Sequence, residues 1–189
     1  GERTGAVLEV VVGPWCFVGD PCQAVLDGDE VLGRLGGPAV GLAPDLDRIR
    51  GAAPIFVVIA FGQKLAPEFV EGRFAINLHG SLLPRWRGAA PIQRAVMEGD
   101  REVGVTVISI AERVDAGVIY ASATTTVGAA ETAGELHDRL AQLGPAVIDE
   151  VLAKHAAGAV HGEAQDPSLV TRAKKLSRAD AWVELAQPA

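Results

Sequence analysis

Residues 55–60, IFVVIA, form a short, unbroken run of apolar and mostly β-branched side chains. Such a run is typical of a strand that is buried on both faces, in a sheet with helices packed on its two sides. Four further runs have the composition of strands: residues 7–12, 73–79, 103–110 and 118–127. We therefore expect the chain to build an open β-sheet, parallel or mixed.

Two stretches predict helices that would cover this sheet. Residues 91–100 begin with a proline, which suits the first turn of a helix, and contain Gly99, which suits a stop. Thr132 and Glu135 form a T-x-x-E capping box, and apolar residues then recur at helical spacing: Leu136, Leu140, Leu143, Val147, Val151 and Leu152. A further helix is expected around residues 24–35. Strands that alternate with helices predict the α/β class.

Composition excludes several classes of protein. With 49% hydrophobic residues among 189, the chain is too apolar to be disordered, yet no run approaches the roughly 18 apolar residues of a membrane-spanning helix. The sequence starts without the regions of a signal peptide, and Cys16 and Cys22 alone cannot form a disulfide framework or a four-thiolate zinc site. We expect a cytoplasmic protein. Its net charge of −7 argues against a surface that binds nucleic acid throughout.

Polar side chains around residue 78 are the first candidates for a functional site. Asn77 and His79 are two residues apart on a predicted strand, so their side chains point to the same face. They lie near the carboxyl end of that strand, where open α/β sheets bind ligands. An isolated pair of this kind is also compatible with side chains that only satisfy hydrogen bonds at a strand end.

Asp115 adds a carboxylate from a predicted loop, AERVDAGV, between two strands. If those strands neighbour the strand of His79, an amide, an imidazole and a carboxylate converge at the carboxyl edge of the sheet. These groups suit proton transfer and the stabilisation of an oxyanion, although D-x-G is also common in simple turns. The remaining histidines have no spacing typical of metal ligands, and no metal site is expected.

Four segments together resemble the folate-dependent formyltransferase family: N-x-H at 77–79, SLLP at 81–84, RGAAPIQ at 87–93 and DAG at 115–117. Residues 57–69 and 165–182 extend the similarity. The resemblance implies a Rossmann-like open sheet, the formyltransferase fold, and transfer of a formyl group from 10-formyltetrahydrofolate to an amine without a metal. The RGAAPIQ segment is most similar to members that formylate methionyl-initiator-tRNA in translation initiation, so that tRNA is the expected partner.

The resemblance also implies roles for individual residues. Asn77 and His79 would stabilise the oxyanion, and Asp115 would orient the imidazole and assist removal of the proton. The folate would contact residues from several segments: Ile59, Phe61, Gly62, Ser81, Leu82, Leu83, Pro84 and Val114. Arg85 and Arg87 would flank the catalytic mouth and bind the tRNA.

By the same resemblance, residues 1–160 correspond to the catalytic domain and residues 161–189 to a linker toward a C-terminal domain. The first strand–helix unit of the family has no counterpart, so residues 7–12 would be its second strand. An acidic segment, residues 13–30, replaces the basic loop that usually follows. We therefore expect weak binding of tRNA, carried by a few cations: Arg85, Arg87, Arg94, Arg172, Lys174, Lys175 and Arg178.

Two alternatives remain open. A formyltransferase of the same chemistry could act on an amino sugar or on glycinamide ribonucleotide, and a panel of acceptors would separate these substrates. A chain without the first strand–helix unit could also bind folate without catalysing transfer, and thermal melts with and without folate would test its folding and binding.

Overall fold

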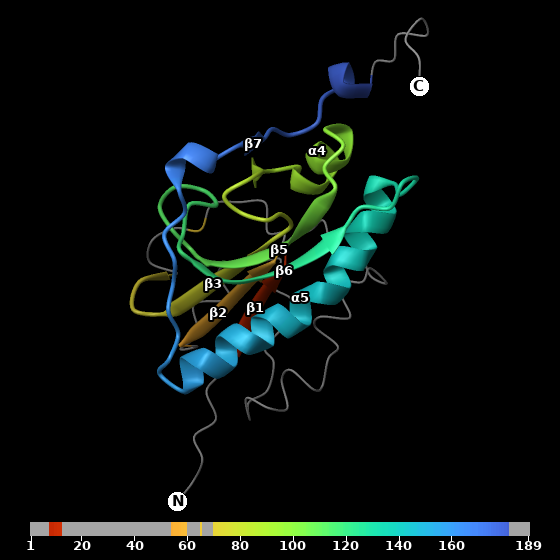
Figure 1. Ribbon diagram of the computed structural model, residues 1–189. Helices are drawn as coiled ribbons and strands as arrows, with labels where there is room; N and C mark the ends of the chain where they lie inside the picture. Colours follow the sequence, from red (N-terminus) through yellow and green to blue (C-terminus); the bar gives the residue numbers. More distant parts are fainter. Residues whose placement is uncertain (1–7, 13–53, 60–64, 66–69, 182–189) are drawn as a thin grey trace, which may run out of the picture.

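The computed structural model describes residues 8–12, 54–59, 65 and 70–181 of the chain (Figure 1). Five strands form one open sheet in the order β1-β2-β3-β5-β6. They are β1 (Leu8–Val12), β2 (Ile55–Ile59), β3 (Phe74–His79), β5 (Glu102–Ser109) and β6 (Ile119–Thr126). The first three are parallel, whereas β5 runs antiparallel to β3 and β6 antiparallel to β5. The predicted open α/β sheet is thus confirmed, and it is mixed.

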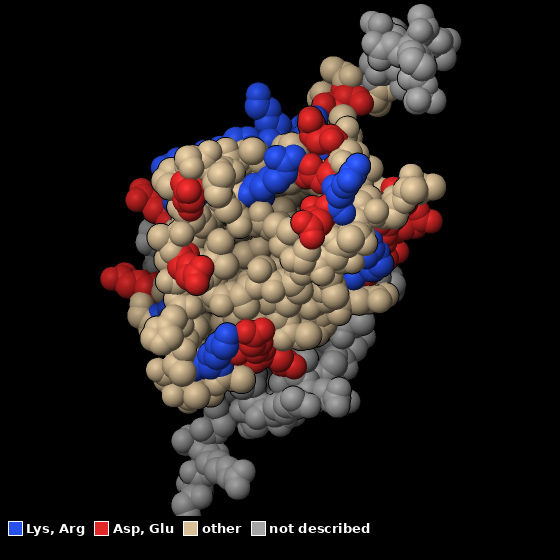
Figure 2. Space-filling model, in the orientation of Figure 1, with Lys and Arg blue, Asp and Glu red and all other residues tan. Residues whose placement is uncertain are grey.

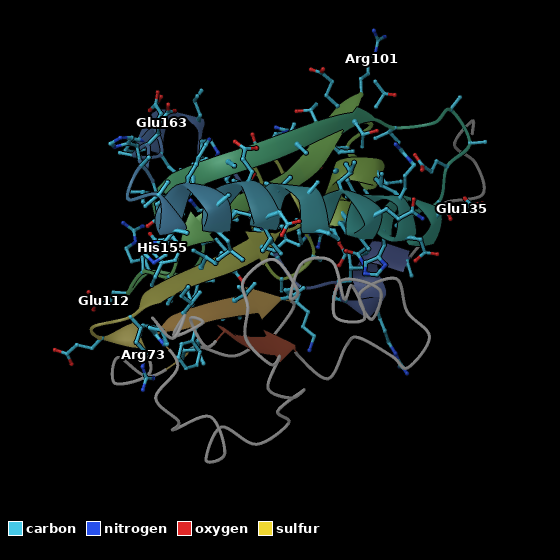
Figure 3. The ribbon with its side chains drawn as sticks, turned by 90° about the horizontal axis from the view of Figure 1, so that it is seen from below. Arg73, Arg101, Glu112, Glu135, His155 and Glu163 are labelled. Atoms are coloured by element: carbon cyan, nitrogen blue, oxygen red, sulfur yellow. The ribbon has the colours of Figure 1, made fainter. Side chains whose placement is uncertain are left out.

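One long helix, α5 (Ala133–Ala156), covers one face of the sheet (Figures 1 and 3). It begins at the predicted capping box: Thr132 Oγ1 accepts from the backbone N–H of Glu135, whose carboxylate accepts from the backbone N–H of Thr132. Its inner side packs so closely on β3 that a Cβ at Gly144 would lie 2.7 Å from Leu78 Cδ2. The buried residues of α5 are Leu136, Leu140, Ala141, Gly144, Val147, Ile148, Val151 and Leu152.

β2 is buried along its whole length, as its unbroken apolar sequence predicts. Ile55, Val57 and Ile59 belong to the core that the sheet shares with α5. Phe56 and Val58 alternate with them and therefore face the other side of the sheet, where they are 1% and 5% exposed. Both faces of the sheet are thus covered at this strand.

The second helix, α4 (Pro91–Met97), starts at the predicted proline, and Gly99 follows it in the left-handed conformation with φ of 68°. Ala95 of α4 joins the core beside α5. None of the helices in the described part of the chain is both long enough and apolar enough to cross a bilayer. The helix expected around residues 24–35 lies outside the described residues.

Residues 161–181, here called the strap, run back from the carboxyl end of α5 past the sheet to α4 (Figure 1). Near its start, Glu163 pairs with Ile119 of β6 through two backbone hydrogen bonds of 2.8 Å. Further along, β7 (Arg172–Ala173) pairs in parallel with β4 (Arg87–Gly88). The strap thus joins the edge of the sheet to the segment that follows β3.

Near its end the strap is bound to α4. Asp180, in the 3-10 turn η3 (Arg178–Ala181), forms an ion pair of 2.6 Å with Arg94. Another 3-10 turn, η2 (Pro167–Leu169), lies between Glu163 and β7. Through Ala181, the segment predicted as a linker is therefore bound to β4, β6 and α4, which lie in the predicted catalytic domain. A domain boundary at residue 160 stays a prediction.

Candidate active site

β3 presents two polar side chains on the face of the sheet opposite α5. Leu78 and Ile76 pack into the core beneath α5, so Asn77 and His79, which alternate with them, point the other way. His79 is 7% exposed, and Asn77 is half-buried. The two side chains therefore lie on one face, as their spacing indicates.

The two ring nitrogens of His79 face different acceptors. Nε2 lies 2.9 Å from the backbone oxygen of Trp86, and because a carbonyl oxygen only accepts, Nε2 carries a proton. Nδ1 lies 3.5 Å from Oδ1 of Asp115, whose side chain is 11% exposed. A carboxylate also only accepts, so a hydrogen bond between these atoms requires one further proton. A proton between these two atoms would lie away from bulk water.

Several contacts hold Trp86, whose backbone carbonyl accepts the hydrogen bond from His79 Nε2. Its φ is 62°, an uncommon conformation for a residue other than glycine. Its backbone N–H donates to Thr171 Oγ1 at 2.8 Å, and its indole N–H donates to Asp100 Oδ2 at 2.6 Å. The strap and the turn after α4 therefore both hold the carbonyl that sets the orientation of the imidazole.

Asp115 is held by a backbone donor as well as by His79. Its Oδ2 accepts from the N–H of Gly88 at 2.8 Å. Gly88 has φ of 125°, and a Cβ there would lie 2.5 Å from the carbonyl oxygen of Ala173. Only glycine therefore allows β4 to approach β7 and still aim its N–H at the carboxylate.

The sequence predicts that Asp115 meets His79 at the carboxyl edge of the sheet, but it does not predict the route by which Asp115 arrives there. Because β5 is antiparallel to β3, it ends level with Ile76, and the N–H of Ile110 donates to the carbonyl of Ala75. Residues 110–118 therefore start toward the amino end of β3 and fold back across the face of the sheet. His79 and Asp115 meet over this face.

Asn77 offers an amide on the same face as His79. Its neighbours on the two adjacent strands are Val58 and Ile108, which are apolar and 5% and 2% exposed. Within the part of the chain that the structure describes, the Asn77 side chain has no hydrogen-bond partner. A half-buried amide with unused donors on the same face as His79 is a candidate donor to a substrate oxygen.

Two of the residues predicted to bind folate shape the loop after β3. Ser81 and Leu83 are 3% and 8% exposed. The hydroxyl of Thr106 donates to the Ser81 carbonyl at 2.6 Å and accepts from the N–H of Leu83 at 3.2 Å. Leu82 and Pro84, between and after them, are half-buried. The loop is therefore tied to β5, and its side chains are largely turned inward.

The other residues predicted to bind folate differ in how exposed their side chains are. Ile59 is 4% exposed and belongs to the core, which leaves only its backbone for a ligand. Val114 is 58% exposed beside Asp115, so its side chain is open to contact. Phe61 and Gly62 lie outside the described residues. Folate binding by all these residues stays a prediction.

The two arginines predicted to bind tRNA have contrasting environments. Arg85 has a 46% exposed side chain that donates to both carboxylate oxygens of Asp100, at 3.0 and 2.6 Å, and stacks over Trp86. The hydrogen bond to Asp100 raises the pKa of Arg85 and lowers that of Asp100. Arg85 is therefore accessible but already paired.

Arg87 is buried, whereas its predicted role in binding tRNA requires an exposed cation. It is 7% exposed, and its Nε and Nη2 donate to the side-chain oxygen of Gln165 at 2.9 and 2.7 Å. Burial lowers the pKa of this guanidinium, and the nearby charges of Arg172 and Arg113 lower it further. A contact between Arg87 and a phosphate would require this arrangement to open.

Gln165 is the residue at this site that sequence reasoning missed. It lies in the polar strap, where no periodicity or motif of chemistry distinguishes it. Its 9% exposure and its contacts with both Arg87 and the Asp115 loop are consequences of tertiary packing.

Charge around the site is mixed rather than uniformly positive. On the face shown in Figure 2, Lys and Arg side chains are interspersed with Asp and Glu, and a broad uncharged area lies below them. In the strap, Arg172, Lys174, Lys175 and Arg178 are exposed. Among the described residues, no three His, Cys, Asp or Glu side chains gather where they could share a metal ion.

Comparisons with known proteins agree with this chemistry. The methionyl-tRNA formyltransferase of Pseudomonas fluorescens SBW25 is 47% identical over 137 residues, which are 71% of this chain and 43% of that protein. That of Methylococcus capsulatus is 44% identical over 163 residues, 85% of this chain and 49% of that protein. The chain thus spans about half the length of the curated relatives it matches.

Solved structures share the fold at lower identity. The formyltransferase PseJ of Anoxybacillus kamchatkensis has a TM-score of 0.70 at 22% identity, over 88% of this chain and 85% of that one. HypX of Aquifex aeolicus has a TM-score of 0.79 at 17% identity, over 97% of this chain and 33% of that one. Residues 46–152, more than half of the sequence, match the family described as Formyl transferase. On sequence, fold and site together, this chain belongs to the formyl transferase family.

Proposed function

We propose that this chain transfers a formyl group from 10-formyltetrahydrofolate to the amino group of methionyl-initiator-tRNA. The observation that carries the proposal is the contact of His79 with Asp115. The same face bears the amide of Asn77, which has no hydrogen-bond partner among the described residues. Relatives at 44–47% identity are named methionyl-tRNA formyltransferase, which supports the acceptor. The Anoxybacillus enzyme is in complex with tetrahydrofolate, which supports the donor.

The reaction makes two demands on the site. The lone pair of the amine attacks the formyl carbon, and negative charge develops on the formyl oxygen. The attacking nitrogen then loses a proton, and the bond from the carbon to N10 of the folate breaks as N10 takes up a proton. The site must therefore stabilise an oxyanion and carry one proton from nitrogen to nitrogen.

Asn77 meets the first demand. Its amide donors have no other partner in the described part of the chain, so they are available to the formyl oxygen as charge develops. A donor of this kind contributes about 3 kcal/mol to the stability of the transition state in comparable sites. Both ring nitrogens of His79 already face acceptors, so His79 makes no hydrogen bond to the oxyanion and acts on it only through the charge it gains when Nδ1 shares the proton.

Asp115 and His79 meet the second demand. The carboxylate accepts the proton of the attacking amine, either directly or through a water molecule, and Nδ1 of His79 lies 3.5 Å away to share it. The N–H of Gly88 holds the other carboxylate oxygen, so the acid cannot turn away from the imidazole. The proton is then available for N10 of the departing folate.

The experiment follows formyl transfer to charged initiator tRNA with the purified chain. We expect formyl-methionyl-tRNA to form with 10-formyltetrahydrofolate, and His79→Ala to lower kcat by about 10²-fold or more with little change in folate affinity. A comparable loss of folate binding would instead make His79 a ligand contact. Leu169→Ala, an exposed position in η2, serves as the control variant.

A panel of acceptors decides between the proposal and its rivals. The same assay is run with elongator methionyl-tRNA, a nucleotide-linked amino sugar and glycinamide ribonucleotide. Transfer to one of the small amines but not to the tRNA would replace the proposed acceptor. Folate binding by calorimetry without transfer to any acceptor would identify a catalytically silent folate-binding protein.

A further inference from the structure

We propose that Gln165 is a positioning residue for the His79–Asp115 pair, acting by fixing the backbone of the turn that carries Asp115. The inference rests on the proposed function, in which that pair moves the proton. Gln165 lies 50 residues beyond Asp115 in the sequence and touches neither His79 nor the Asp115 carboxylate in the contacts described below. Its effect on the reaction is therefore indirect.

The side-chain amide of Gln165 is completely used. Its oxygen accepts from Nε and Nη2 of Arg87 at 2.9 and 2.7 Å. Its nitrogen donates to the backbone oxygens of Asp115 and Gly117 at 2.9 and 2.8 Å. A guanidinium only donates and carbonyls only accept, so just one orientation of the amide fits. With 9% exposure, water cannot readily replace these bonds.

The turn that Gln165 holds needs such support. Asp115 has φ of 54°, a left-handed conformation that costs free energy for any residue other than glycine. The N–H of Gly88 holds its carboxylate, and Gln165 holds its carbonyl. Together these bonds set both the backbone and the side chain of Asp115, and with them the 3.5 Å separation from His79 Nδ1.

Arg87 anchors the amide from the opposite side. It lies in β4 beside Gly88, so the same two residues reach Asp115 by two paths: Gly88 directly, and Arg87 through Gln165. The guanidinium of Arg87 is buried, and its role in this arrangement is to hold the side-chain oxygen of Gln165. The strap thus closes a ring of contacts around the catalytic carboxylate.

The variant Gln165→Glu separates the two sides of the amide. A carboxylate still accepts from Arg87, so that the strap keeps this attachment. It cannot donate to the carbonyls of Asp115 and Gly117, and its charge repels their oxygens. Ser168→Ala is the matched control, because Ser168 is exposed in the same strap and, among the described residues, its side chain bonds only to Asp166.

The kinetic test is a double-mutant cycle with Asp115→Asn in the formyl-transfer assay. We expect Gln165→Glu to lower kcat by at least tenfold with less than a threefold change in KM for folate. In the Asp115→Asn background, the same change should cost less than twofold, because the carboxylate it positions is gone. An equal loss in both backgrounds, or an unchanged kcat in the single variant, overturns the proposal.

A second measurement does not depend on activity. In ¹⁵N NMR spectra of the imidazole, we expect Gln165→Glu to move the Nδ1 signal of His79 toward its position in Asp115→Asn, while Ser168→Ala leaves it in place. A His79 signal that ignores Gln165→Glu overturns the positioning role. Absence of formyl transfer by the unsubstituted chain would instead refute the proposed function, and the NMR result would still decide the role of Gln165.

Discussion

Gly88 connects three parts of the molecule through a single backbone unit. Its N–H donates to the Asp115 carboxylate, its strand β4 pairs with β7 of the strap, and Ala173 of β7 fills the space in which a side chain would lie. The residue also has φ of 125°. Both the conformation and the close approach exclude a Cβ at this position.

Gly88→Ala is therefore expected to weaken folding and activity together. The backbone conformation alone costs roughly 1–3 kcal/mol, and β7 must move away from β4 to relieve the 2.5 Å contact. Gly99→Ala is the control, because Gly99 also has a positive φ but nothing lies within 4 Å of its Cβ position. Urea unfolding should show a clearly larger loss for Gly88→Ala. Equal losses would show that β4 and β7 can separate without cost.

At the scale of elements, periodicity determined how much could be predicted. The five strands of the main sheet have regular apolar patterns and were each predicted within one residue of their observed bounds. The helix predicted over residues 91–100 starts at the predicted proline but already ends at Met97. β4 and β7 are two residues long and have no pattern to detect. The direction of β5 also has no local signal, so the route by which Asp115 crosses the face could not be predicted, although its proximity to His79 was.

The capping box of α5 gives a prediction for a single element. Thr132→Ala removes the acceptor for the N–H of Glu135 and should lower the free energy of unfolding by about 1 kcal/mol. Thr132→Ser keeps a hydroxyl at the cap and should restore most of the loss. Thermal melts of the three proteins test this directly. An equal destabilisation by serine would assign the effect to the methyl group of Thr132 rather than to the cap.

At the scale of the whole molecule, the two ends of the strap are held by different kinds of interaction, hydrogen bonds at one end and an ion pair at the other. Near its start it pairs with β6 through backbone hydrogen bonds, and near its end Asp180 pairs with Arg94. The carboxylate of Asp180 accepts from Arg94 and from Ser177, and these contacts hold its pKa well below the usual range. Attachment of the strap to α4 therefore depends on pH, whereas its attachment to the sheet does not.

Asp180→Asn should lower the melting temperature at neutral pH and have no effect in strong acid. The pKa of Asp180 is lower in the folded than in the unfolded state, so its ionised form stabilises the fold above the unfolded pKa of about 3.9. This contribution starts to decrease when the pH falls below that value and is lost only as the pH falls through the lower pKa of the folded state. The difference between the melting temperatures of the two proteins should therefore be constant from pH 7 to about pH 5 and shrink from there to pH 2. A difference that stays constant down to pH 2 would mean that the ion pair is not its source.

The exposed cations of the strap give a prediction for nucleic-acid binding. Each phosphate contact with a duplex contributes about 0.9 to the slope of log affinity against log salt concentration. Lys174→Gln with Lys175→Gln should therefore weaken tRNA binding and reduce that slope by about 2. Lys154→Gln is the control, because Lys154 is exposed on α5 and pairs with Glu150 there. An unchanged slope in the strap variant would place the tRNA on another surface.

The ring of contacts around Asp115 also bears on synthesis of the chain. His79 contacts Asp115, which lies 36 residues later in the chain. Asp115 is held in turn by Gln165 and, through Gly88, by Ala173. Contacts over such distances form late, because the intervening chain must first be closed into loops. While the polypeptide leaves the ribosome, the sheet can assemble before Gln165 and Ala173 are available to support the turn of Asp115. Under the proposed function, a nascent chain therefore reaches full activity only after the strap has emerged.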